Sequence, residues 1–141
     1  MTIKELSQLY HLKKEITELG ERLYKLKTEA YAASSANLSG MPAPTGNTSK
    51  TERYAIEIAA LEDMISDRQD RCIDELFKLE QWINMIDDSR LRLIFTYRFV
   101  NRLSWVQVAF RIGGYETEDS VKKACYRYLK EDENDNTEHC D

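Results

Sequence analysis

The sequence predicts an all-α protein in which a long antiparallel helical hairpin or coiled coil precedes a small helix-turn-helix. Three observations lead to this fold class. The 141 residues are 32% charged and 42% hydrophobic with only two prolines and five glycines, a composition rich in helix formers. Two long segments carry apolar residues in steps of three and four, and the chain then shows two shorter amphipathic segments around a glycine pair.

The first heptad seam and a matching second seam predict a coiled-coil hairpin over residues 1–86. The first seam comprises Leu9, Leu12, Ile16, Leu19, Leu23, Leu26, Ala30 and Ala33. The second comprises Tyr54, Ile58, Leu61, Ile65, Gln69, Cys72, Leu76, Leu79, Ile83 and Ile86, with a stutter at Gln69. Neither helix can bury its stripe alone, so the hairpin closes within one chain, between two chains, or both. A homodimer through the coiled coil is expected.

Residues 34–50 interrupt the pattern with two prolines, two glycines and many Ser, Thr and Asn residues. This composition predicts a flexible linker between the two long helices. At the other end of the chain, residues 131–141 hold six acids and no base or large apolar side chain, and we expect a disordered acidic tail.

Residues 87–130 contain the signals of a helix-turn-helix domain. Asp87, Asp88 and Ser89 begin a lead-in helix, and Ser104 with Gln107 forms a capping box for the next one. Gly113 and Gly114 should end that helix, since glycine readily takes positive φ. The expected buried face of the first short helix is Val106, Val108, Ala109 and Ile112, and the expected aromatic core is Trp82, Phe95, Phe99, Trp105 and Phe110.

A second short helix should begin near Thr117, with Glu118 and Asp119 in its first turn. One face of this helix is an apolar stripe made of Val121, Ala124, Cys125, Tyr128 and Leu129. The other face has the composition of a helix in a DNA groove. The residues predicted to contact double-stranded DNA are Ser120, Lys122, Lys123, Tyr126 and Arg127, with Arg111 and Lys130 on phosphates.

The charge distribution agrees with that prediction. The net charge is −5, but residues 87–130 hold nine basic and five acidic side chains between two acidic segments. At physiological salt, charges more than about 8 Å apart are largely screened, so a basic module can meet phosphate although the whole chain is acidic.

A resemblance to known proteins points in the same direction. The run LSWVQVAFRIGGYETEDSVKKACYRYLK resembles region 4 of bacterial sigma factors, with a hydrophobic-Ser-aromatic start and a Gly at the turn. The preceding MIDDSRLRLIFTYRFVNRLSW and the NLSGMP stretch at Asn37 to Pro42 look like a family of small phage and prophage proteins of Gram-positive bacteria. The resemblance implies a late transcription regulator of the ArpU/RinA type, with host RNA polymerase as a further candidate partner.

The acidic residues at the turn depart from the usual pattern of a helix that reads a groove. Glu116, Glu118 and Asp119 either stabilise the helix terminus, accept hydrogen bonds from cytosine amino groups, or indicate a protein partner. The alternative function is therefore a non-enzymatic interaction module, an adaptor or nucleic-acid-mimicking inhibitor with the helix-turn-helix as scaffold.

An enzyme, a cofactor and a membrane span are not expected. The sequence has no glycine-rich phosphate loop, no HExxH motif and no cysteine-histidine cluster. Three widely spaced cysteines, Cys72, Cys125 and Cys140, favour neither disulfides nor a metal site and suggest a reducing host cytoplasm, and His139 beside Cys140 supplies too few ligands. No apolar run approaches the roughly 20 residues of a membrane span, and Met1 to Leu12 lacks a signal-peptide core.

Overall fold

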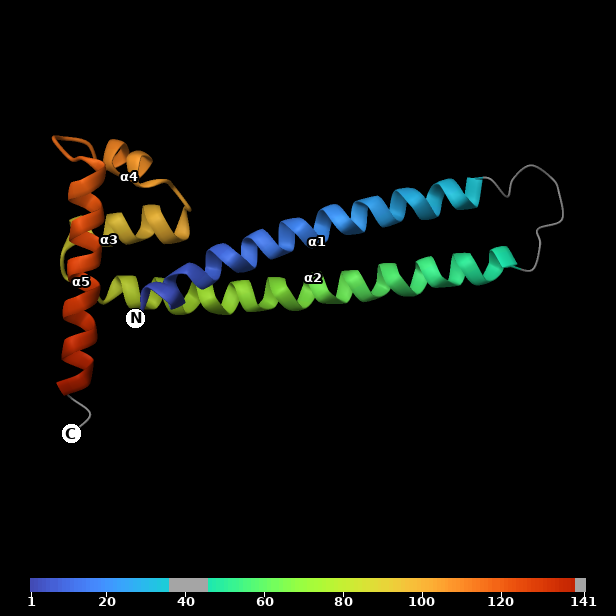
Figure 1. Ribbon diagram of the computed structural model, residues 1–141. Helices are drawn as coiled ribbons and strands as arrows, with labels where there is room; N and C mark the ends of the chain where they lie inside the picture. Colours follow the sequence, from blue (N-terminus) through green and yellow to red (C-terminus); the bar gives the residue numbers. More distant parts are fainter. Residues whose placement is uncertain (36–45, 139–141) are drawn as a thin grey trace. The chain divides into compact units, whose positions relative to one another are not determined.

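The computed structural model describes residues 1–35 and 46–138. The secondary structure of these residues is helical and they contain no strand, as the sequence predicts. The long helices are α1 (Ile3–Ser35) and α2 (Gly46–Asn84). The helix α3 (Ser89–Phe95) continues directly into a π-helical turn, η2 (Thr96–Val100). Two further helices follow, α4 (Trp105–Ile112) and α5 (Glu118–Glu138) (Figure 1). The chain forms two compact units. The first unit is Leu12–Arg71, and the second unit combines Met1–His11 with the chain from Cys72 onward.

The unit Leu12–Arg71 is an antiparallel pair of helix segments. Arg68 donates to Glu15 at 2.8 Å, and Lys27 lies 3.0 Å from Glu62, so later residues of α1 meet earlier residues of α2. The predicted apolar seam lies between the two helices, where Leu12 and Leu61 are buried and the other seam residues of this unit are partly buried, apart from Gln69. The prediction of a helical hairpin is confirmed within this unit.

The seam position assigned to Gln69 is wrong, because Gln69 is exposed. Arg68 takes that place with a side chain only 24% exposed. An arginine can do this because its aliphatic stem packs along apolar surface while its guanidinium reaches a carboxylate, here that of Glu15. Each one-residue change of position on a helix rotates a side chain by about 100°, so a stutter is difficult to assign to one residue from the sequence.

The predicted linker 34–50 is shorter than expected at both ends. α1 extends to Ser35 and α2 already begins at Gly46. Residues 46–50 contain no proline, so nothing prevents the helix from starting ahead of its first seam residue. The rest of the predicted linker, including the NLSGMP stretch, lies outside the described residues.

The second unit has one contiguous hydrophobic core. The helices α3, α4 and α5 pack against one another (Figure 1). Side chains from the start of α1 and the end of α2 belong to the same core. Leu6 is buried one turn before the first predicted seam residue. The buried residues are Leu6, Leu9, Leu79, Ile83, Ile86, Ile94, Phe95, Phe99, Trp105, Val108, Ala109, Val121, Cys125 and Leu129.

The aromatic core contains four of the five predicted residues. Trp82 meets Phe95 edge to face with ring centroids 4.9 Å apart, and Phe99 contacts both Phe95 and Trp105. The assignment of Phe110 to this core is wrong, since Phe110 is 89% exposed. Tyr128 joins the cluster, 5.8 Å from the Phe95 ring and 6.0 Å from that of Trp82.

Phe110 and Val106 are exposed for the same reason. The inward face of α4 is taken by Trp105, Val108 and Ala109, spaced as one side of a helix, with Ile112 partly buried behind them. Residues 106 and 110 lie four apart on the other side, so Val106 is 60% exposed. The predicted buried face of this helix is therefore corrected at Val106.

The predicted acidic tail differs from the structure over residues 131–138, which continue α5. Two contacts accompany this helix: the Met1 amino group lies 2.7 Å from Asp132, and the Thr137 hydroxyl donates to the Glu133 carbonyl at 3.0 Å. A helix already nucleated by packed residues can propagate at low cost through polar residues. Residues 139–141, including His139 and Cys140, lie outside the described residues.

Candidate nucleic-acid interface

The two helices α4 and α5 are joined by a turn whose capping is as predicted. The Ser104 N–H donates to Gln107 Oε1 at 2.9 Å and the Gln107 N–H donates to Ser104 Oγ at 3.3 Å, which completes the capping box. α4 ends at Gly113 and Gly114, with φ of +80° and +68°. These values lie in the region that side chains with a Cβ disfavour, so the glycine pair fixes where the first short helix stops.

Thr117 and Ser120 cap the start of α5 reciprocally. The Ser120 N–H donates to Thr117 Oγ1 at 3.2 Å, and the Thr117 N–H donates to Ser120 Oγ at 3.0 Å. The predicted helix start near Thr117 is confirmed. Ser120, which the sequence predicts on the DNA-facing side, is partly buried, and its hydroxyl and N–H take part in this cap.

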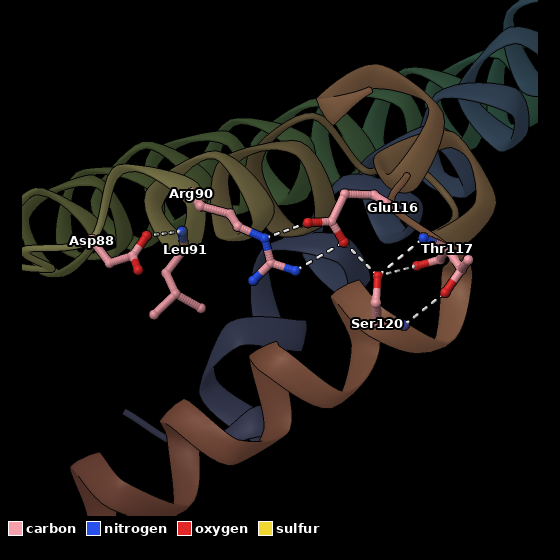
Figure 2. Close-up of polar contacts among 6 residues, drawn as sticks. All are labelled: Asp88, Arg90, Leu91, Glu116, Thr117 and Ser120. Carbon is pink, nitrogen blue, oxygen red and sulfur yellow. Dashed lines mark hydrogen bonds and ion pairs between the residues drawn. The ribbon is translucent and has the colours of Figure 1, made fainter. Parts of the chain in front are cut away.

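Glu116 is held by an arginine of α3, as Figure 2 shows. Arg90 Nε donates to Glu116 Oε1 at 2.5 Å and Arg90 Nη2 donates to Oε2 at 2.9 Å, a two-point contact. The Ser120 hydroxyl also donates to this carboxylate. The hydrogen bonds from Arg90, followed by that from Ser120, lower the pKa of Glu116 to about 2. The negative charge of Glu116 is therefore compensated by Arg90 within the same unit.

The outer face of α5 gathers basic side chains along a shallow groove of about 560 Å³. The residues that line it are Asp119, Lys122, Lys123, Tyr126, Arg127 and Lys130. On the opposite side of the same helix, Val121, Cys125 and Leu129 are buried in the core. Packing of this inner stripe fixes which face of α5 is presented to solvent, and that face carries four cations and one carboxylate.

Arg111 does not line this groove. Its guanidinium lies over the Tyr97 ring, 4.8 Å from the centroid, on the side of η2. Such cation–π contacts hold an arginine in place and leave its N–H groups free to reach a further acceptor. The structure thus brings together five of the seven predicted DNA-contacting residues, and separates Arg111 and Ser120 from them.

Tyr126 connects the basic face to the core through Trp105. The two rings lie 6.2 Å apart, and the Arg98 guanidinium stacks over the same indole at 4.7 Å. Arg98 Nη1 also donates to the Leu103 carbonyl at 2.9 Å. Arg98 lies in η2, and the sequence around it does not distinguish it from an arginine exposed to solvent. Sequence reasoning therefore missed it.

Arg102 was also missed, and its backbone is unusual. Its φ is +62°, and among the described residues no other non-glycine residue has positive φ. The left-handed conformation costs an L-residue about 1–2 kcal/mol. Glycine or asparagine is the usual residue with positive φ after a helix end. An arginine at this position therefore gives no signal in the sequence that its φ is positive.

Cys125 is buried in the hydrophobic core of its unit. Burial raises the pKa of the Cys125 thiol to about 12, so this thiol is not a nucleophile at neutral pH. The described part of the chain holds no group of three or more His, Cys, Asp or Glu side chains that could bind a metal ion. No helix within residues 1–35 and 46–138 combines the length and the apolar character that a bilayer span requires.

Comparison of the chain with models of protein families, with curated proteins and with solved structures finds no match. The assignment of a function therefore depends on the site itself.

Proposed function

We propose that this chain is a DNA-binding transcription regulator of the phage type, in which α5 enters the major groove. The observation that carries the proposal is the groove on α5, where four cations and Tyr126 lie on the exposed face of a helix that follows a tight turn. The resemblance of this stretch to sigma-factor region 4 supports the same orientation. A recognition helix needs this arrangement, with one side fixed in a core and the other free.

The side chains of the groove divide into two tasks. Lys122, Lys123 and Lys130 suit phosphate oxygens, where each neutralised charge releases a counterion and adds to the salt dependence of binding. Arg127 suits a guanine edge, with which an arginine forms a two-point contact worth about 1–3 kcal/mol of discrimination. Asp119 is the one carboxylate of this groove and suits a cytosine amino group. Glu116 is neutralised by Arg90 and does not oppose this use.

The proposal includes a homodimer formed through the hairpin. Within the unit Leu12–Arg71, Tyr24, Tyr31 and Ile56 are 73%, 76% and 69% exposed. The two tyrosines lie seven residues apart, one heptad, so they share one face of α1. A stripe of large apolar rings on an otherwise charged helix supports association with a second helix, and a dimer would present two recognition helices.

The experiment that tests DNA binding is fluorescence anisotropy with labelled random duplexes at two salt concentrations. The test variant carries Lys122→Ala, Lys123→Ala and Arg127→Ala. The matched control removes the same charges from exposed positions of α1, with Lys14→Ala, Arg22→Ala and Lys25→Ala. We expect wild type and control to bind and to weaken steeply with salt, and the folded test variant to lose binding. Equal binding by both triple variants would refute a role for this face.

A second candidate function is a protein-interaction module, and a specific observation favours it. Phe110 and Val106 form an exposed apolar pair on α4, 89% and 60% exposed, beside the turn. Apolar pairs of this kind are typical of protein contacts, and host RNA polymerase or another phage target would be the partner. Failure of wild type to bind any duplex at low salt, together with purified polymerase binding that Phe110→Ser abolishes, would favour this function.

A further inference from the structure

A second positively charged site lies in the same unit, away from the groove on α5. It is a pocket of about 370 Å³ lined by Ser7, Tyr10, His11, Arg98, Phe99 and Arg102. Two arginines and a histidine line it, and none of these described residues is acidic. A concave site with donors and no carboxylate is suited to an anion.

The two arginines of this pocket are held in place without using up their donors. The Arg102 guanidinium stacks over Tyr10, 5.0 Å from the ring centroid. Arg98 stacks over Trp105 and donates from Nη1 to the Leu103 carbonyl, which leaves Nε and Nη2. Stacking fixes the plane of a guanidinium and keeps its N–H fork available for two oxygens of one anion.

The backbone at Arg102 is a second, independent observation. η2 ends with the Leu103 N–H donating to the Tyr97 carbonyl at 3.0 Å, and Arg102 lies inside this bend with φ of +62°. Glycine is the usual residue at such a helix exit. Strained backbone and π-helical turns both recur at ligand sites, where an unfavourable conformation is kept because it positions a side chain.

We infer that this pocket binds a phosphate group through Arg98 and Arg102, with His11, Tyr10 and Ser7 at its wall. The favoured source is a backbone phosphate of the duplex held by α5, and in this respect the inference rests on the proposed function. Trp105 contacts Arg98 and Tyr126, so one indole adjoins both the pocket and the basic face. A free phosphate ion would use the same chemistry.

The informative variant is Arg102→Gly. Glycine accepts the left-handed backbone without strain, which offsets the greater conformational entropy that glycine gives the unfolded chain, so this variant should fold with a stability close to that of wild type if Arg102 serves binding. A merely structural arginine would show the opposite result, a loss of stability when its contact with Tyr10 is removed. Arg22→Gln is the control for the pocket, because Arg22 is an exposed cation of α1 that lies outside it.

The first measurement is NMR titration of the full chain with inorganic phosphate at constant ionic strength, following the Nε–H signals of Arg98 and Arg102. We expect saturable shifts in wild type and in Arg22→Gln, and about tenfold weaker binding in Arg102→Gly. The second measurement is the salt dependence of duplex binding. Arg102→Gly should lower the slope of log K against log salt by about 1, whereas Arg22→Gln on α1 should leave it unchanged.

The two measurements separate failure of this site from failure of the proposed function. If wild type binds no duplex but phosphate binds in an Arg102-dependent way, the DNA function fails and the site stands with free phosphate as its ligand. If Arg102→Gly changes neither the phosphate response nor the salt slope, the inference is overturned even if α5 binds DNA. A destabilised Arg102→Gly with unchanged phosphate binding would overturn it too.

Discussion

Neutralising Glu116 should weaken the domain by an amount that depends on pH. The folded pKa of about 2 lies below the ordinary 4.5, so the ion pair with Arg90 contributes its full stability above about pH 4.5. That contribution is lost as pH falls from 4.5 towards 2. A shift of this size corresponds to about 3 kcal/mol if fully expressed. Because the Arg90 side chain is 40% exposed, solvent screening reduces our expectation to about 1–2 kcal/mol.

The assay is denaturant unfolding of wild type and Glu116→Gln between pH 7 and pH 2.5, followed by tryptophan fluorescence. Glutamine keeps the shape of the side chain and removes its charge, so the stability difference should be largest at pH 7 and should shrink below pH 4.5. Glu118→Gln is the control, an exposed carboxylate two residues along, for which we expect a change of at most about 0.5 kcal/mol. A difference between wild type and Glu116→Gln that stays constant across the pH range would refute the reasoning, as would equal effects of both variants.

Three further predictions concern the turn, the two faces of α4 and the acidic end of α5. Gly113→Ala should lower the free energy of unfolding by about 1 kcal/mol in denaturant titration, since φ is +80° and no neighbouring atom lies within 4 Å of an added Cβ. Val108→Ala, at a position with no exposed surface, should cost about 2 kcal/mol, whereas Phe110→Ser should stay within about 0.5 kcal/mol. A chain ending at Lys130 lacks the acidic turns of α5 and should bind duplex several-fold more tightly at low salt in anisotropy, an increase that high salt should abolish.

Local signals in the sequence predicted the helix boundaries of the helix-turn-helix well. The capping box at Ser104, the glycine pair and the cap at Thr117 each act over a few residues, so their chemistry is readable from neighbours in the chain. The apolar stripe of α5 also predicted correctly which face of that helix is buried, and the opposite face is exposed apart from Ser120.

Errors arose where the outcome depends on residues distant in the sequence or on side chains that suit two environments. Its aromatic ring predicts Phe110 in the core, but Trp105, Val108 and Ala109 fill the inward positions of α4. The heptad pattern predicts Gln69 in the seam, with a stutter, whereas in the structure the stem of Arg68 fills that position. The composition beyond Lys130 predicts a disordered segment, because the helix there depends on propagation from the packed part of α5.

The ion pair of Glu116 changes how the acidic residues at the turn bear on DNA binding. From the sequence, Glu116, Glu118 and Asp119 form one acidic group facing the approach of a duplex. In the structure Glu116 lies against Arg90 and Ser120, and its side chain is only 19% exposed. Glu118 is exposed in the first turn of α5, where the helix dipole favours a carboxylate.

Of the three acidic residues, only Asp119 lines the groove, against four cations. Repulsion between a phosphate and this groove would therefore come from one carboxylate, and Asp119→Asn should tighten binding to random duplex, where no matched cytosine contact is lost, more than Glu116→Gln does. The reverse order would indicate that the groove on α5 is not where the phosphates lie.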